Sequence, residues 1–122
     1  MKDNGCNPSS ESIVLMIGRE MVLIPFEKIE YIETVNKRYT IHFVDINDNP
    51  LIVRSQDLEK QFLARPEFIR SHRSYIVNLN RIRTMEEKKL ISLNEKVIPV
   101  ASLHEAKVKA ALVKRLYEAV RN

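Results

Sequence analysis

Apolar and polar positions alternate along this chain in short stretches separated by turn-forming residues. A period of two over four to eight residues is typical of β-strands, and short polar connections are typical of hairpins. The connection Gly18-Arg19-Glu20 and the segment with Lys37 and Arg38 each separate two such stretches. The pattern therefore predicts two hairpins in the first half of the chain, with strands at residues 12–17, 21–24, 29–34 and 39–44.

More strands of the same kind follow. A turn rich in Asp, Asn and Pro at residues 45–50 precedes the next apolar run, and short polar segments separate the later ones. A spacing of about ten residues per strand argues for an assembly of β-sheets. The later strands are predicted at residues 51–53, 75–79, 82–85, 89–93 and 96–100.

Two segments have helical periodicity instead. In the first, Leu58, Phe62 and Leu63 form an apolar stripe that ends before Pro66, with Ser55 as the expected N-cap. The second runs from residue 103 to about 117, with Ser102 and Glu105 as a capping-box pair. Its apolar stripe, which we expect to be buried, contains Val108, Leu112, Leu116 and Val120. The pattern predicts a mainly antiparallel β fold with a short internal helix and a C-terminal helix.

Length and composition are those of one folded domain. The chain has 122 residues, of which 44% are hydrophobic and 30% charged. Residues 1–11 are polar and are expected to form a flexible tail, which leaves 12–122 as the domain. The single cysteine, Cys6, has no partner for a disulfide and no metal-ligand spacing. No apolar run approaches the roughly 20 residues of a membrane helix, so we expect a cytoplasmic protein.

Positive charge is concentrated at expected turns. The net charge is +4 and the isoelectric point is about 9.3. Acidic residues lie mostly elsewhere, and such segregation is what a one-sided contact with a polyanion requires. The cations near turns are Arg19, Lys37, Arg38, Arg54, Arg70, His72, Arg73, Arg81 and Arg83.

One segment, residues 68–80, combines cations with apolar anchors. Arg70, His72 and Arg73 directly precede a strand pattern that begins at Tyr75. A rigid strand would hold a loop of guanidinium groups in place, and a guanidinium binds phosphate oxygens or guanine edges through two parallel hydrogen bonds. The segment therefore indicates a nucleic-acid partner.

The sequence Phe-Ile-Arg-Ser-His-Arg-Ser-Tyr-Ile-Val-Asn-Leu in this segment resembles the signature of LytTR DNA-binding domains, the output domains of many bacterial response regulators. Residues 25–33, the Leu58 helix and Val97-Ile98-Pro99-Val100 resemble further motifs of that family in the same order. The resemblance covers roughly residues 13 to 120. It implies a mainly β transcription regulator that inserts loops, not a recognition helix, into DNA grooves, and it implies no cofactor.

The resemblance also implies which residues contact double-stranded DNA. Direct reading of bases is expected from Lys37, Arg38 and Arg73, with Tyr39 and His72 as further candidates. Arg70 and Arg81 are expected to hold phosphates. After the Ile-Pro-Val strand the family commonly carries an arginine, whereas this chain has Ala101-Ser102, so His104 or Lys107 would substitute. The implied DNA-binding set is Lys37, Arg38, Tyr39, Arg70, His72, Arg73, Arg81, Ser102 and His104.

Several of these residues also have a purely structural interpretation. Lys37 and Arg38 are ordinary residues for a hairpin tip, Tyr39 could simply pack, and His72 could cap the turn before Ser74. Asn78 is expected to satisfy backbone groups and not to read a base. No serine-carboxylate or cysteine arrangement lies near His72 in sequence to support nucleophilic catalysis, so we do not expect an enzyme.

Two other classes of protein remain open, and so do the larger assembly and its partners. An RNA-binding β module would need exposed aromatic platforms. A protein-interaction or anti-regulator module could keep the fold without DNA contacts. Without a leucine zipper the chain should be a monomer in the absence of DNA. The resemblance to the LytTR family implies operators with direct repeats, each bound by one copy. A receiver domain or sensor kinase would lie outside these residues.

Overall fold

The computed structural model describes residues 11–54 and 57–121; residues 1–10 of the expected tail and the expected N-cap Ser55 lie outside them. Strands form the largest part of the described chain, which also contains two α-helices and two short 3-10 helices. The elements in chain order are β1 (Ser12–Ile17), β2 (Glu20–Pro25), η2 (Phe26–Lys28), β3 (Ile29–Val35), β4 (Arg38–Phe43), β5 (Leu51–Arg54), α1 (Leu58–Leu63), β6 (Phe68–His72), β7 (Tyr75–Asn78), η3 (Leu79–Arg81), β8 (Ile82–Glu86), β9 (Lys89–Ser92), β10 (Val97–Pro99) and α2 (Ser102–Arg121).

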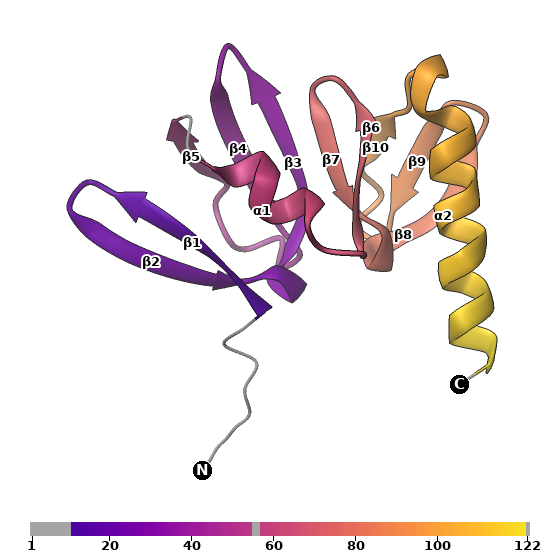
Figure 1. The fold of residues 1–122 in the computed structure, drawn as a ribbon, viewed down its shortest axis with the longest axis horizontal. Helices are drawn as coiled ribbons and strands as arrows, with labels where there is room; N and C mark the ends of the chain where they lie inside the picture. The colour runs from indigo at the N-terminus through magenta and orange to yellow at the C-terminus, as the bar shows by residue number, and fades with distance from the viewer. Residues whose placement is uncertain (1–10, 55–56, 122) are drawn as a thin grey trace.

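The strands form three antiparallel sheets, which confirms the predicted fold class (Figure 1). A five-stranded sheet with the order β5-β4-β3-β7-β6 lies at the centre of the chain's topology. The β1-β2 hairpin forms a two-stranded sheet, and β10-β9-β8 form a three-stranded one. The predicted hairpins at residues 12–24 and 29–44 are both present.

The two faces of the five-stranded sheet bury two separate apolar cores. Because side chains alternate along a strand, Ile32 and Ile76 point into the first core while Tyr31 and Val77 point into the second. The first core also contains α1 and the inner face of β1, and the second contains the three-stranded sheet and Val108 of α2. The five-stranded sheet is therefore the common support of both halves.

One side chain of α1 adds hydrogen bonds to the apolar contacts that hold the β1-β2 hairpin on the first core. Gln61 of α1 accepts a hydrogen bond from the backbone N–H of Val14 (2.9 Å) and donates one to its carbonyl (3.0 Å). These two bonds replace those that a neighbouring strand would make with β1. Phe26, Phe62 and Phe68 pack ring to ring beside them, with centroids 4.9–5.6 Å apart.

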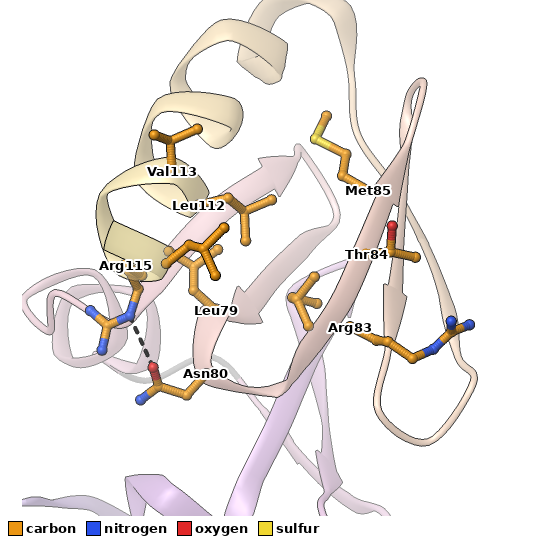
Figure 2. A pocket seen from close by; sticks show the side chains of 10 residues that line it. Leu79, Asn80, Arg83, Thr84, Met85, Leu112, Val113 and Arg115 are labelled. Carbon is orange, nitrogen blue, oxygen red and sulfur yellow. Dashed lines mark hydrogen bonds between the residues drawn. The ribbon is translucent and has the colours of Figure 1, made fainter. Parts of the chain in front are cut away.

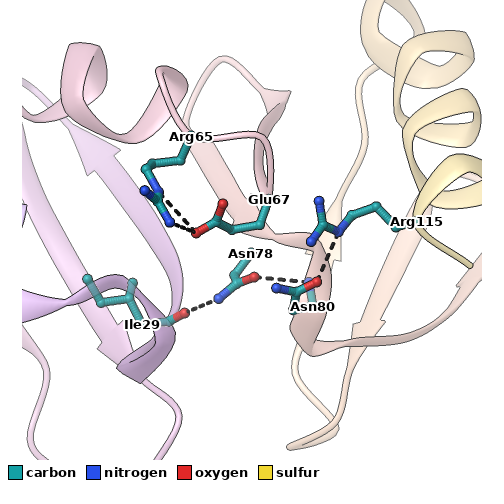
Figure 3. A network of polar contacts seen from close by, with 6 residues as sticks. All are labelled: Ile29, Arg65, Glu67, Asn78, Asn80 and Arg115. Carbon is teal, nitrogen blue, oxygen red and sulfur yellow. Dashed lines mark hydrogen bonds and ion pairs between the residues drawn. The ribbon is translucent and has the colours of Figure 1, made fainter. Parts of the chain in front are cut away.

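Polar side chains link the start of β3, the end of β7 and helix α2 (Figure 3). Asn78, which is 1% exposed, donates to the Ile29 carbonyl (2.9 Å) and accepts from the backbone N–H of Asn80 (2.9 Å). Arg115 of α2 then donates through Nε to Oδ1 of Asn80 (2.9 Å). The prediction that Asn78 satisfies backbone groups is confirmed.

The structure differs from the sequence prediction in three places. Residues 68–72, expected as a loop that presents cations, form strand β6 because they pair with β7 and because Ser71 bonds the Pro99 carbonyl. Ser102 begins α2 instead of preceding it. The sequence predicts a buried stripe on α2, but Leu116 is 68% exposed, since no described element packs over it. The side chain of Val120 lies outside the described residues.

Among the described residues, no helix is both long and apolar enough to cross a membrane.

Candidate nucleic-acid interface

Three segments that are distant in sequence meet along one edge of the molecule, at the top of Figure 1. They are the β3-β4 turn (36–37), the β6-β7 turn (73–74) and the start of α2 (101–104), and we call them the turn edge. The N–H of Thr34 donates to the Ser74 carbonyl (2.9 Å), and the N–H of Ala101 donates to the Ser71 carbonyl (2.8 Å). Backbone hydrogen bonds therefore hold the three segments in a fixed order.

The β3-β4 turn presents two cations. Val35 pairs with Arg38, which leaves Asn36 and Lys37 as a two-residue turn. Both have positive φ, 52° and 63°, as a type I′ hairpin turn requires. Lys37 and Arg38 are exposed, so their position at the hairpin tip agrees with the sequence prediction.

Side chains of β6 hold the β6-β7 turn through hydrogen bonds to its backbone. Nδ1 of His72 accepts a hydrogen bond from the N–H of Ser74 (3.1 Å), which agrees with the turn-capping interpretation of this residue. Arg70 donates through Nη1 to the carbonyl of Arg73 (3.0 Å). Arg73 itself is exposed. The turn is thus held by its neighbours while the Arg73 side chain faces solvent.

One carboxylate of α1 connects the strands that carry both turns. Glu59 accepts a hydrogen bond from the Tyr39 hydroxyl (2.7 Å) and forms an ion pair with Arg70. Tyr39 is 7% exposed, and its burial and the Glu59 hydrogen bond raise the pKa of its hydroxyl. Tyr39 and Arg70, both expected as DNA contacts, are therefore engaged inside the protein.

The start of α2 contributes hydroxyl and amine groups to the turn edge. Ser102 accepts a hydrogen bond from the ammonium of Lys88 (2.6 Å), which brings the β8-β9 turn to the same place. His104 is partly exposed on the first turn of the helix. Ser102 and His104 thus lie on the first turn of α2 at the turn edge, and Lys88 is an addition that the sequence did not indicate.

Arg81 lies elsewhere. Strand β7 begins at the turn edge and runs away from it, and Arg81 follows in η3. Its Nη2 donates to the Glu27 carbonyl (3.2 Å), while its Nε is buried without a partner among the described residues. The structure does not bring Arg81 together with the other candidate residues, so its expected phosphate contact gains no support.

The arginines divide into bonded and available ones. Arg65, Arg70, Arg83 and Arg115 bond acidic or amide side chains. Three exposed arginines at the ends of sheet strands make no such bond to another described residue: Arg38, Arg54 and Arg73. Arg54 lies directly opposite Arg38 in the β4-β5 pairing, an unfavourable arrangement of like charges that a polyanion would relieve. The sequence placed Arg54 near a turn but did not identify it as a DNA contact, because the seven residues between β4 and β5 do not determine their register.

The tyrosines on the second face of the sheet are also engaged internally. Tyr31 stacks on His42 (4.2 Å between centroids), and the Tyr75 hydroxyl donates to Glu33 (3.3 Å). Burial, with the nearby carboxylates of Glu33 and Glu30, raises the pKa of Tyr31 to about 12. These rings do not form an exposed stacking platform for single-stranded bases.

Among the described residues, no group of three or more His, Cys, Asp or Glu side chains could hold a metal ion.

A mainly β domain with available arginines along one edge has the features of a nucleic-acid-binding module. The sequence model of the LytTr DNA-binding domain matches residues 19–113, and the chain belongs to this family. A solved LytTr DNA-binding domain from Bacillus cereus superposes with a TM-score of 0.64 at 23% sequence identity. The alignment covers 84% of this chain and 96% of that one, which shows the shared fold. No curated protein sequence matches the chain.

Proposed function

We propose that residues 12–122 form a sequence-specific, double-stranded DNA-binding domain of a bacterial transcription regulator, and that the turn edge reads the major groove. One observation carries this proposal: exposed cations from β4, β5 and the two turns lie along one edge without a bond to an acidic or amide side chain among the described residues. They are Lys37, Arg38, Arg54 and Arg73. Family membership supports DNA as the polyanion.

Contacts to bases and contacts to phosphates are assigned to different residues. Lys37 and Arg73 lie at or beside two-residue turns that can enter a groove, where their side chains donate to guanine O6 and N7. Arg38 and Arg54 lie further back on the sheet and suit phosphate oxygens. The Tyr39–Glu59–Arg70 contacts hold the turns before DNA arrives, so less ordering is needed on binding.

The start of α2 supplies a third contact region with weaker donors. Ser102 and His104 can donate one hydrogen bond each, and Lys88 adds a charge beside them. A hydroxyl or imidazole discriminates bases less strongly than a bidentate guanidinium. We therefore assign most of the sequence specificity to the two turns. A receiver domain or sensor kinase outside these residues would control occupancy of the DNA site.

The test compares binding to a selected operator and to a scrambled duplex of equal length. Arg73→Ala should cost roughly 1–3 kcal/mol on the operator and much less on the scrambled duplex. Arg54→Gln should weaken both alike, as expected of a phosphate contact. Arg19→Gln, which removes an exposed arginine from the β1-β2 turn, serves as the control. Equal losses on both duplexes for Arg73→Ala would reduce this residue to a backbone contact.

A second candidate function is supported by one observation. The start of α2 carries Ala101 and Ser102 where the resemblance predicts an arginine, as expected of a protein-interaction module that has lost DNA contacts. A folded protein without duplex binding at low salt would favour this function. Equal affinity for single strands and duplex would instead favour an RNA-binding module.

A further inference from the structure

An apolar groove runs between strand β8 and the second half of α2, about 15 Å along the helix from the turn edge at 1.5 Å per residue. Figure 2 shows Leu79, Leu112 and Val113 on one side of it and Thr84 and Met85 on the other. Its volume is about 380 Å³. A second hollow of about 450 Å³ shares Met85, Leu112 and Val113 with it, so the two form one continuous groove.

The helix side of this groove is apolar and uncovered. Leu112 packs against the second core, but the next residues outward, Val113 and Leu116, are 66% and 68% exposed. Burial of such side chains by a partner removes apolar surface from water, which favours association. Leu116 continues the helical stripe whose earlier residues, Val108 and Leu112, pack in the second core, and Val113 lies beside that stripe.

The strand side offers backbone hydrogen bonds. β8 is an edge strand of the three-stranded sheet and pairs only with β9 among the described strands. Alternate N–H and C=O groups of an edge strand point away from its partner and can accept another strand. The groove therefore combines an unpaired strand edge with an apolar helix wall, the arrangement that binds extended peptides by strand addition.

The charge of the lining favours an acidic occupant. Arg115 lies at one end of the groove, and among the described residues its guanidinium bonds only Asn80, through Nε. Lys109 lies near the other end but forms an ion pair with Glu105 (3.5 Å), so Arg115 is the main cation available to a partner. Arg83 points away from the helix toward β9-β10 and pairs with Glu95 (3.1 Å). The one carboxylate in the lining is that of Glu87. The volume of the groove is that of a few side chains. It therefore suits a single extended strand better than a second folded domain.

We propose that this groove binds an extended segment of a partner protein in which apolar residues alternate with acidic ones. The segment adds a strand to β8, places its apolar side chains against Leu112 and Leu116, and directs a carboxylate to Arg115. β8 has five residues, so the contact spans about 17 Å at 3.3–3.4 Å per residue. The Glu87 end of the groove adjoins the β8-β9 turn, whereas its Arg115 end lies away from the turn edge.

The experiment uses amide chemical shifts of the isotope-labelled full chain and three synthetic peptides. In the first peptide Leu alternates with Glu, in the second Leu alternates with Lys, and the third is the first with proline at its centre. The Leu-Glu peptide should shift the amides of residues 82–86 and 109–116 and bind more tightly than the Leu-Lys peptide. The proline peptide should bind at least about fivefold more weakly, because it lacks one donor and cannot extend the ladder.

Matched variants locate the binding surface. Leu116→Gln should weaken the Leu-Glu peptide about tenfold, since it removes an apolar contact without adding charge. Leu103→Gln, an 88% exposed leucine at the start of the same helix, should leave peptide binding unchanged. Both variants replace exposed residues, so both should fold. Shifts confined to other elements, equal binding of the proline peptide, or β8 amides that respond to protein concentration without peptide would overturn the proposal; the last result would identify a second copy as the occupant.

Discussion

A single carboxylate, that of Glu59, organises the residues behind the turn edge. It bonds Tyr39 of β4 and Arg70 of β6 from its place on α1. Glu59→Gln keeps the size of the side chain but removes its charge, so we expect the free energy of unfolding to fall by about 1–2 kcal/mol, the lower value reflecting partial exposure. Urea unfolding and duplex titration should show losses in both stability and DNA affinity.

Glu105→Gln is the control for this prediction. Glu105 forms an ion pair with Lys109 (3.5 Å) on the surface of α2, and such pairs contribute less than about 1 kcal/mol. If Glu59→Gln weakened DNA binding no more than Glu105→Gln, the carboxylate would not position the turns.

Tyr31 should make stability depend on alkaline pH. Its pKa is raised to about 12 in the folded protein by burial and by neighbouring carboxylates, whereas the unfolded chain has the ordinary value of 10. The unfolded state therefore loses its proton first, and the stability contributed by the neutral form is present below pH 10 and lost as pH rises through 12. At about pH 11 the loss should be roughly 1 kcal/mol.

Tyr31→Phe should remove this part of the alkaline decline, measured as the urea midpoint against pH. Tyr117→Phe, which changes a 63% exposed tyrosine, should retain it. Identical pH profiles for Tyr31→Phe and the unmodified protein would mean that another group causes the decline.

At the scale of elements, a charged residue occupies a position in the β3-β4 turn where glycine would make the protein more stable. Lys37 has a φ of 63°, which costs an L-residue roughly 1 kcal/mol and a glycine almost nothing. Lys37→Gly creates the preferred Asn-Gly turn, so the protein should become more stable by about 0.5–1 kcal/mol while DNA affinity falls.

The matched variant is Lys37→Gln, which removes the charge but keeps the left-handed backbone. Thermal unfolding should show a gain only for Lys37→Gly, whereas duplex titration should show a similar loss for both. Unchanged DNA affinity in both variants would exclude Lys37 from the interface.

At the scale of the whole molecule, the cations of the turn edge should make binding strongly salt-dependent and independent of a protein dimer. Each phosphate contact contributes about −0.9 to the slope of log affinity against log salt. The two expected phosphate contacts, Arg38 and Arg54, should by themselves give a slope of roughly −2, and the charges of Lys37 and Arg73 in the groove should steepen it. Fluorescence anisotropy over a range of salt concentrations measures this slope, and a flat dependence would count against DNA.

We also expect one copy of the protein per repeat on direct-repeat operators. Repeats spaced by about one helical turn place both copies on the same side of the duplex. Sedimentation should show a monomer alone, one copy on a single repeat and two on a double repeat. A tight dimer without DNA, or a strictly palindromic operator, would contradict this arrangement.

The sequence by itself determined the elements and the family. Alternation of apolar residues and the turn chemistry of short connections are local properties, so they predicted both early hairpins, α1 and most later strands. The contiguous signature around residues 68–80 predicted the LytTR family, which the match over residues 19–113 confirms. Arg73 and Lys37 could be placed at turns for the same reason.

Only the tertiary structure decided which of these side chains remain available. Arg70 and Tyr39 bond Glu59 because α1 packs across β4 and β6, and Arg54 joins Arg38 because of the β4-β5 register. Leu116 is exposed because neither core extends along the whole of α2. Each of these facts depends on contacts between segments distant in the chain, which local periodicity does not encode.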